Sequence, residues 1–328
     1  MQFRVKYHSK TVEVIIRPGV SKDYLFPPAK YLLLTDTNVG PLYQETFIKR
    51  IPDLQIVTIP AGEKSKNLNN AVEIIRHLSK EEFSRTDYLL TLGGGVIGDL
   101  GAFVASVYKR GMRLIHIPTS LLSQVDSCLG GKTGIDFIGE NGLYKNQIGT
   151  IYHPELVLVD PDFLKTLPAE ERSSAFGEII KTALCCNREV FDLLFTDFSL
   201  PDLIGRVLKI KAEITEADEF EKRERLLLNF GHTFGHAIES LSGIRHGEAV
   251  ALGMLHEIHD EGIKNSLLEL YKKFNLPTMH PYQLEELKNL IRQDKKITTS
   301  KIRLPAVLDV GKTTILETDL ETYLGRIK

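Results

Sequence analysis

The chain has 328 residues, of which 42% are hydrophobic and 26% charged, and 41 basic residues against 43 acidic ones give a net charge of −2. This length is typical of two globular domains, and the near-neutral charge excludes a global field that favours nucleic acid or an anionic membrane. The three cysteines form no disulfide framework, and neither a signal-peptide core nor an apolar run of about 18 residues is found, so we expect a cytoplasmic protein without a membrane segment.

Short β-rich runs alternate with helix-like stretches between about residues 30 and 160. The runs are YLLLTDTNV, LQIVTIPAG, DYLLTLGGG, RLIHIP and ELVLVD, with the helical AVEIIRHLSK among them. This alternation predicts an α/β domain with a mostly parallel, Rossmann-like sheet. After Pro168 the segments become long and amphipathic, which is typical of helices. We therefore predict an α/β domain over residues 1–165 and an α-helical domain over residues 166–328.

A glycine-rich turn follows the run DYLLTL and precedes the apolar stretch LGAFVASVY. Glycines between a strand and a helix let backbone N–H groups approach a pyrophosphate. The spacing departs from the G-x-G-x-x-G fingerprint, and many glycine turns merely reverse the chain. Polar residues at two other strand ends, Asp36 with Asn38 and Glu63 with Lys66, favour nucleotide binding because ligands bind at the carboxyl edge of such sheets.

Three histidines and a glutamate form a candidate metal site. His232 and His236 lie four residues apart, so they share one face of a helix, and His246 begins the next helical segment. Glu178 lies on an earlier amphipathic segment, with Lys181 one turn later. One carboxylate and two imidazoles with an open position are typical of a catalytic divalent-metal site. Two histidines at this spacing also occur on plain helix surfaces, and the spacing leaves open which of the three is not a ligand.

Basic and amide side chains accompany these motifs, namely Lys132, Lys145, Asn146, Lys181, Lys211, Arg225, Asn229, Lys295 and Lys296. Several lie in apolar or glycine-rich surroundings, where a lone lysine is costly without an anionic partner. They predict a ligand with a phosphate or a carboxylate. Lys222 and Arg223, in the charged run EFEKRER, are instead expected to be solvated.

Nine motifs together resemble the 3-dehydroquinate synthase family. They are GGGVIGDL, YKRG, IPTSLLSQVDSCLGGKTGID, KNQIG, FLKTLP, AFGEIIK, LNFGHTFGHAIE, HGEAVALGM and DKK, in that order. The resemblance implies a lyase of the shikimate pathway that converts 3-deoxy-D-arabino-heptulosonate 7-phosphate to 3-dehydroquinate and phosphate. It also implies transient oxidation by NAD, phosphate elimination, reduction and aldol closure, a divalent metal (zinc or cobalt), and a homodimer.

The resemblance assigns roles to individual residues. Glu178, His232 and His246 match the metal ligands, which leaves His236 as a catalytic histidine alongside Lys132, Lys181 and Asn229. Substrate-binding positions are Arg110 (from the neighbouring subunit), Asp126, Lys132, Asn146, Lys181, Lys211, Arg225, Asn229, His236, and Lys295 or Lys296. NAD-binding positions are Asp36, Asn38, Glu63, Lys66, Gly94, Gly95, Asp99, Thr119, Ser120, Asp126, Lys145, Phe163, Thr166, Leu167 and Glu171.

Some features depart from the family pattern. Asp136 stands where asparagine is common, Arg223 where glycine is frequent, FIGENGLY makes the loop before Lys145 longer, and the loop before His246 is short. Another sugar phosphate cyclase, acting on sedoheptulose 7-phosphate or glucose 6-phosphate, is one alternative function. A non-catalytic homologue that binds NAD or a sugar phosphate is another, although no residue of the expected metal site is lost.

Overall fold

The computed structural model describes residues 1–140, 142–292 and 301–327, and the chain divides into two compact units. Unit 1 comprises Met1–Leu167 and Leu200–Leu208, and unit 2 comprises Pro168–Ser199 and Lys209–Lys328. The first half of one long helix is therefore grouped with the N-terminal unit, although it follows the start of the helical region in sequence.

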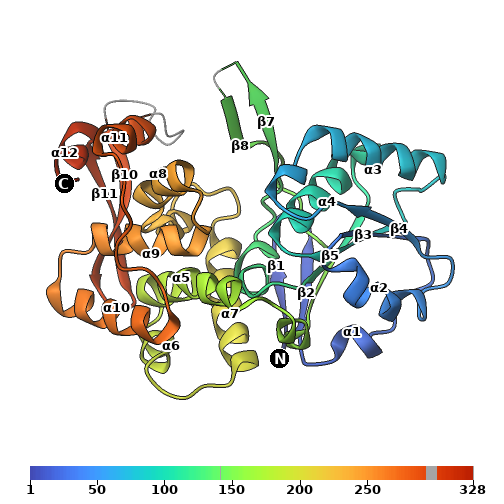
Figure 1. The fold of residues 1–328 in the computed structure, drawn as a ribbon. Coiled ribbons are helices and arrows are strands. Elements are labelled where there is room, and N and C mark those ends of the chain that lie inside the picture. The colour runs from blue at the N-terminus through green and yellow to red at the C-terminus, as the bar shows by residue number, and fades with distance from the viewer. Residues whose placement is uncertain (141, 293–300, 328) are drawn as a thin grey trace. The chain divides into compact units, whose positions relative to one another are not determined.

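Unit 1 is built on a seven-stranded sheet in the order β1-β2-β9-β6-β5-β3-β4 (Figure 1). The strands are β1 (Gln2–Lys6), β2 (Thr11–Ile16), β3 (Tyr31–Asp36), β4 (Gln55–Ile59), β5 (Tyr88–Gly93), β6 (Arg113–Pro118) and β9 (Leu156–Val159). All neighbouring pairs are parallel except β1 with β2, which are antiparallel. The predicted parallel α/β sheet is thus confirmed, and its central strands β3 and β5 are buried along their whole length, as strands covered on both faces must be.

Helices cover both faces of this sheet. The helices and 3₁₀ or π turns of unit 1 are α1 (Val20–Asp23), α2 (Gly40–Ile48), η1 (Glu63–Ser65), α3 (Leu68–Lys80), α4 (Gly95–Val107), η2 (Tyr108–Arg110), η3 (Ser123–Ser127) and η4 (Pro161–Lys165). Ile74 of α3 and Leu100 of α4 pack with Leu34 and Leu89 on one face. Phe47 of α2 joins the other core, which contains alternate residues of the same strands. The carboxyl edge of the sheet remains available for polar groups.

The segment before Lys145 was expected to be a long loop. It is instead part of a β-hairpin, so the expected loop is wrong. Strand β7 (Ile135–Gly139) pairs antiparallel with β8 (Gly142–Ile148), and Phe137 lies opposite Tyr144. Gly142, the first residue of β8 after the turn, has a φ of 116°, which a glycine adopts without strain. Two aromatic residues in cross-strand register favour a ribbon over an irregular loop. The edge strands β1 and β2 were also not predicted.

Unit 2 is mainly helical, as predicted, and also contains a two-stranded ribbon that was not predicted. Its helices and turns are α5 (Ala169–Cys186), α6 (Arg188–Leu193), the second half of α7 (Leu200–Ala217), η5 (Glu224–Asn229), α8 (His232–Ser242), α9 (His246–Glu257), α10 (Glu261–Phe274), α11 (Leu284–Arg292) and α12 (Leu320–Gly325). The ribbon is β10 (Lys301–Asp309) with β11 (Lys312–Asp319). At its turn, the Gly311 N–H donates to the Leu184 carbonyl near the end of α5. Among the described residues, no helix combines the length and apolar character needed to cross a membrane.

One buried histidine of unit 1 gives a pH prediction. His116, on β6, is 6% exposed, and its Nδ1 lies 2.6 Å from the Thr91 hydroxyl. Burial lowers the pKa of His116 to about 4, whereas the unfolded value is about 6.5. Because the unfolded chain then binds more protons between these values, the native state loses up to about 3 kcal/mol of stability as the pH falls through this window.

We expect the difference in unfolding free energy between wild type and His116→Gln to shrink as the pH falls from about 7 to about 4. Urea unfolding at several pH values measures it. A difference that stays constant with pH would contradict the shifted histidine, because His116→Gln removes this titration and leaves the other ionisable groups in place.

Candidate functional site

The glycine turn lies where strand β5 passes into helix α4. A Cβ at Gly93 would lie 2.6 Å from the Ile97 side chain, so the strand end and first helical turn approach closely only with glycine there. Gly94 is the N-cap of α4 and provides no side-chain cap, so the first N–H groups of the helix have no capping side chain. The strand–turn–helix arrangement expected of a phosphate cradle is therefore present.

Two of the charged residues predicted around this turn form an ion pair. The Lys66 ammonium donates to Asp99 Oδ2 at 2.6 Å, and the Lys66 side chain is 5% exposed. Burial alone would lower the pKa of Lys66, but the carboxylates of Asp99 and Glu63 outweigh it and raise that pKa. Burial raises the pKa of Glu63. The pair joins the segment after β4 to the first turns of α4.

Further residues of the predicted nucleotide site lie at the carboxyl ends of neighbouring strands. Asp36 ends β3, and its Oδ1 accepts hydrogen bonds from the Asn38 and Val39 N–H groups at 2.9 Å. Thr119 and Ser120 follow β6, whose last residue is paired with Gly93 of β5. A cavity of about 10 Å³, the size of one water, lies beneath the turn and is lined by Thr91, Gly93, Gly94, Gly98, His116, Pro118, Ser123, Ser127 and Cys128. Asp126 lies in the adjacent π-helical turn η3, a form common at functional sites.

Three residues of the predicted NAD site follow strand β9. Phe163 is buried in η4, and its carbonyl accepts from the Thr166 hydroxyl at 3.2 Å; Leu167 follows and is half-buried. Tyr43 of α2, which was not predicted, lies edge-on to Phe163 and shares a 2.5 Å hydrogen bond with Thr166. Nothing in the local sequence around Tyr43 marks it, because the contact joins segments far apart in the chain. Glu171, also predicted here, lies in unit 2, where its carboxylate accepts from Arg245 at 3.1 Å.

The hairpin β7–β8 carries two more predicted residues, Lys145 and Asn146, both of them exposed. Asn146 has a φ of 51°, and its N–H donates to Asp136 Oδ1 at 2.9 Å. The Asp136 N–H in turn donates to the Lys66 carbonyl at 2.7 Å. The aspartate that departs from the family pattern therefore holds the backbone of Asn146. Lys132 lies on the strand-like segment before β7 and is exposed in the single chain.

Arg110 lies in a turn with unusual backbone angles. Both Lys109 and Arg110 have positive φ, 47° and 63°, and Gly111 follows at 117°. The turn is held by hydrogen bonds from Lys109 Nζ to the Phe83 carbonyl and from Arg85 Nε to the Gly111 carbonyl. Two consecutive left-handed residues that are not glycine cost energy, and such strain gathers at functional sites. The turn presents the Arg110 side chain to solvent.

In unit 2, glycines bring three helices close enough to assemble the histidines with Glu178. A Cβ at Gly177 would lie 2.0 Å from the Gly247 carbonyl oxygen, and one at Gly235 would lie 2.9 Å from the Ala249 carbonyl oxygen. Helix α5 therefore touches α9, and α8 touches α9, at backbone distance. Because Glu178 follows Gly177 and His246 precedes Gly247, this contact sets the two side chains against each other.

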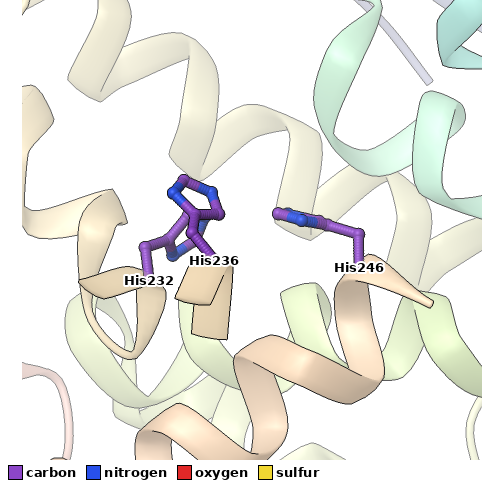
Figure 2. Close-up of side chains that lie close together, drawn as sticks. All are labelled: His232, His236 and His246. Carbon is purple, nitrogen blue, oxygen red and sulfur yellow. The ribbon is translucent and has the colours of Figure 1, made fainter. Parts of the chain in front are cut away.

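The three predicted histidines lie together (Figure 2), and their ligand nitrogens all fall within 4.8 Å of one another. Glu178 distinguishes among them: its Oε1 lies 3.4 Å from His232 Nε2 and 3.3 Å from His246 Nε2. His232 is 9% exposed, whereas His236 is an exposed residue. Glu178, His232 and His246 thus converge on one point beside His236.

The surroundings of Glu178 Oε1 fit a bound cation. Glu178 is 2% exposed, its Oε2 accepts from Lys181 at 2.5 Å, and its Oε1 makes no hydrogen bond of good geometry to the described residues. A buried carboxylate oxygen without a donor is costly, and a divalent ion would satisfy it together with two imidazole lone pairs. Burial would raise the pKa of Glu178, but Lys181 and His246 hold it well below its usual range.

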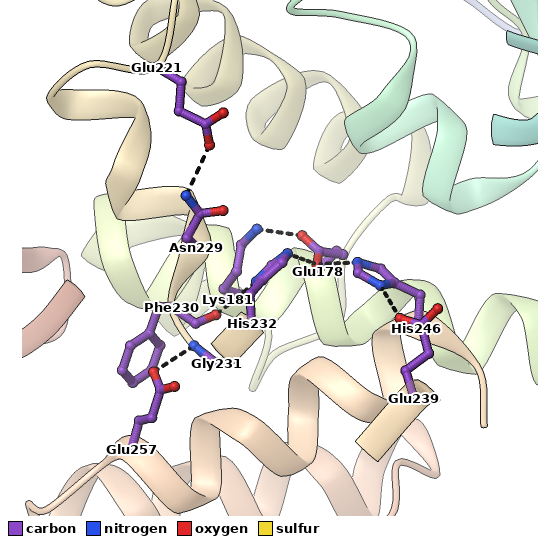
Figure 3. Close-up of polar contacts among 10 residues, drawn as sticks. All are labelled: Glu178, Lys181, Glu221, Asn229, Phe230, Gly231, His232, Glu239, His246 and Glu257. Atoms are coloured by element: carbon purple, nitrogen blue, oxygen red, sulfur yellow. Dashed lines mark hydrogen bonds and ion pairs between the residues drawn. The ribbon is translucent and has the colours of Figure 1, made fainter. Parts of the chain in front are cut away.

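The imidazoles of His232 and His246 face Glu178 with Nε2, and each is held through Nδ1 (Figure 3). His246 Nδ1 lies 2.9 Å from Glu239 Oε2, and His232 Nδ1 lies 3.1 Å from the Phe230 carbonyl. Burial would lower the pKa of His246, but its contacts with Glu178 and Glu239 outweigh this and raise it to about 10. Neither Glu239 nor its role was predicted, although it occupies the same helix as His232 and His236.

A second group of predicted residues precedes α8. Lys211 and Arg225 are 6% and 3% exposed, and Arg225 donates to the Glu219 carbonyl at 2.9 Å. Asn229 donates from Nδ2 to Glu221 Oε1 at 2.9 Å (Figure 3). Glu221 is a further contact that the sequence did not single out.

The charged run before Arg225 folds around Asp218. Its carboxylate accepts hydrogen bonds from the N–H groups of Lys222, Arg223 and Arg225, which hold the pKa of Asp218 below its usual range against the effect of burial. Arg223 has a φ of −144°, which lies outside the left-handed region that favours glycine. Lys222 and Arg223 are exposed, as expected. Lys295 and Lys296 lie outside the described residues.

Comparisons with known proteins agree over the whole chain. The family model described as 3-dehydroquinate synthase N-terminal matches residues 56–174, and the one described as 3-dehydroquinate synthase C-terminal matches residues 175–297. The 3-dehydroquinate synthase of Latilactobacillus sakei is 40% identical over 91% of this chain and 88% of its own length, and that of Streptococcus mutans is 37% identical over 98% of each.

Solved structures show the same fold. A 2-deoxy-scyllo-inosose synthase complexed with carbaglucose-6-phosphate, NAD+ and Co²⁺ matches with a TM-score of 0.87 and 21% identity, covering 99% of this chain and 98% of that one. The 2-epi-5-epi-valiolone synthase of Streptomyces hygroscopicus, with NAD+ and Zn²⁺ bound, matches with a TM-score of 0.85 and 25% identity, covering 99% of each chain.

Proposed function

The chain belongs to the 3-dehydroquinate synthase family, and on this premise we propose that it converts 3-deoxy-D-arabino-heptulosonate 7-phosphate to 3-dehydroquinate and phosphate. The observation that carries this proposal is the buried Glu178, whose Oε1 faces His232 and His246 while its Oε2 binds Lys181. A metal site directly beside a buried cation suits a substrate that has both hydroxyls and a phosphate.

We propose that Glu178, His232 and His246 hold a divalent metal, zinc or cobalt. When bound, the metal would polarise a substrate hydroxyl, and NAD would take up and return a hydride. The protein's own task is to fix the substrate for this chemistry and to hold its anionic groups.

Side chains around Glu178 are the proposed substrate contacts in unit 2. Lys181, Lys211 and Arg225 are buried cations suited to a carboxylate or phosphate, and Asn229 offers an amide that Glu221 orients. His236, exposed beside the ligands, is proposed to move protons at the reacting sugar. Lys295 or Lys296 would add a further cation.

In unit 1, the proposed NAD contacts are the residues along the carboxyl edge of the sheet, from Asp36 to Leu167, supported by the Lys66–Asp99 pair and the glycine turn. Glu171, from unit 2, is proposed with them. Asp126, Lys132 and Asn146 are proposed to contact substrate, and Asp126 to contact NAD as well. Arg110, presented on a strained and exposed turn, is proposed to act on the substrate of a second copy, so the active form would be a homodimer in the cytoplasm.

The test follows phosphate release from 3-deoxy-D-arabino-heptulosonate 7-phosphate by the purified protein with metal and substoichiometric NAD, with NADH absorbance recorded in the same cuvette. We expect many turnovers per NAD without accumulation of NADH, because reduction of the intermediate ketone regenerates the cofactor. Sedoheptulose 7-phosphate and glucose 6-phosphate are assayed in parallel.

Turnover of one of these alone would identify another sugar phosphate cyclase. The failure of all three, in protein shown to bind NAD and metal, would indicate a non-catalytic homologue.

A further inference from the structure

We propose that Glu239 is a positioning residue for His246 and that it sets the affinity of the site for a divalent metal. The inference rests on the proposed metal site, because it concerns how one proposed ligand is held. The Glu239 carboxylate lies against Nδ1 of the His246 ring, the nitrogen that does not face Glu178 (Figure 3).

The position of Glu239 determines how the His246 ring is oriented and which of its nitrogens carries the proton. His246 Nδ1 lies 2.9 Å from Glu239 Oε2, and Nε2, on the other side of the ring, lies 3.3 Å from Glu178 Oε1. A carboxylate accepts hydrogen bonds and donates none, so the Nδ1 position must carry the proton when the ring is neutral. The Nε2 lone pair then faces Glu178, where a metal would bind.

The two proposed histidine ligands are held differently. His232 Nδ1 faces the Phe230 carbonyl, which is uncharged, and the His232 side chain is only 11% exposed. The His246 side chain is 33% exposed and begins α9 directly after the short turn at Gly243. Burial therefore restricts the ring of His232, whereas the ring of His246 depends more strongly on its hydrogen bond to Glu239.

The backbone of His246 is held separately from its ring. At the start of α9 the Arg245 N–H donates to Glu248 Oε2 at 3.2 Å, and the Arg245 side chain also pairs with Glu171. On the other side of His246, Gly247 packs against the Ser174 carbonyl of α5. Removal of Glu239 should therefore release the ring while the helix start stays in place, and the effect should fall on metal binding.

The experiment measures dissociation constants for Zn²⁺ and Co²⁺ on the metal-stripped full-length protein, by competition with a chromophoric chelator. We expect Glu239→Ala to weaken metal binding by about 10- to 100-fold, the usual effect of losing such a partner. Glu239→Gln should fall between this variant and wild type, because an amide oxygen still accepts from Nδ1 but carries no charge. The visible absorption of bound Co²⁺ should change in Glu239→Ala, reporting altered ligand geometry.

Glu261→Ala is the control, since it removes an exposed carboxylate of the same unit, one that pairs with Lys264 and does not hold the start of α9. It should bind metal within about twofold of wild type. An unchanged affinity in Glu239→Ala, or an equal loss in Glu261→Ala, would overturn the proposal. If Glu239→Ala does not fold, an affinity of Glu239→Gln equal to that of wild type, with an unchanged Co²⁺ spectrum, overturns it. If wild type binds no metal, the proposed function fails first, which separates the two proposals.

Discussion

Replacement of His232 with alanine is expected to abolish stoichiometric metal binding and to lower turnover by about three orders of magnitude or more. His232 Nε2 lies 3.4 Å from the buried Glu178 Oε1, and its Nδ1 lies 3.1 Å from the Phe230 carbonyl, so the ring presents Nε2 beside that carboxylate oxygen. Loss of a catalytic metal removes several kcal/mol of transition-state stabilisation, and about 1.4 kcal/mol corresponds to each tenfold change in rate. Metal content after dialysis, measured by atomic emission, gives the first readout, and phosphate release gives the second.

His259→Ala is the control for this prediction, because His259 is an exposed histidine of the same unit. It should retain one metal per chain and the activity of wild type. Full metal content in His232→Ala would show that His232 is not a ligand. In that case the same measurement on His236→Ala would identify the alternative ligand, since the three rings lie within reach of one ion.

The second large effect concerns the stability of the metal-free protein. Lys181 and Glu178 form an ion pair of 2.5 Å, and each side chain is 2% exposed. Lys181→Met keeps the apolar length of the side chain but leaves the Glu178 carboxylate buried without its cation. Breaking such a pair from one side costs about 3–5 kcal/mol. We expect Lys181→Met to lower the free energy of unfolding by that amount when metal is absent, measured by urea unfolding in the presence of a chelator.

The double variant Glu178→Gln with Lys181→Met tests whether charge is the cause. Because it removes both charges, it should recover much of the lost stability, although it should not bind metal. Added Zn²⁺ should also narrow the gap between Lys181→Met and wild type, since a divalent ion at Glu178 would supply the missing positive charge. Equal unfolding free energies for Lys181→Met and wild type without metal would contradict an important role for the pair in folding.

Much of the fold could be predicted from the sequence, because local patterns carry it. The buried strands β3, β5 and β6 are largely apolar runs, and the helical period of apolar residues in α10 is readable directly. The strands that were missed are the antiparallel pairs β1–β2, β7–β8 and β10–β11, which rely on cross-strand partners and have weaker local patterns. The expected helical stretch through His232 is interrupted at Gly231, whose φ of 74° separates η5 from α8.

The candidate site, like the fold, could be predicted from the sequence only in part. The spacing of His232 and His236 predicts a shared helix face, which the structure confirms, and it leaves the non-ligand histidine undecided. The structure adds a distinction that spacing could not provide, since Glu178 approaches His232 and His246. It also adds Glu239 and Glu221, each bonded to a residue that the sequence had marked.

The sequence by itself determined the α/β and helical halves, the glycine turn after β5 and the residue types of a metal site, because these depend on periodicity and short motifs. Only the tertiary structure decided which of those residues meet. Helix α5 contacts α9 through Gly177 and Gly247, and this contact brings Glu178 to His246. Local spacing cannot encode such a meeting, since it depends on how closely two helices distant in sequence can pack and on which buried charges must then find a partner.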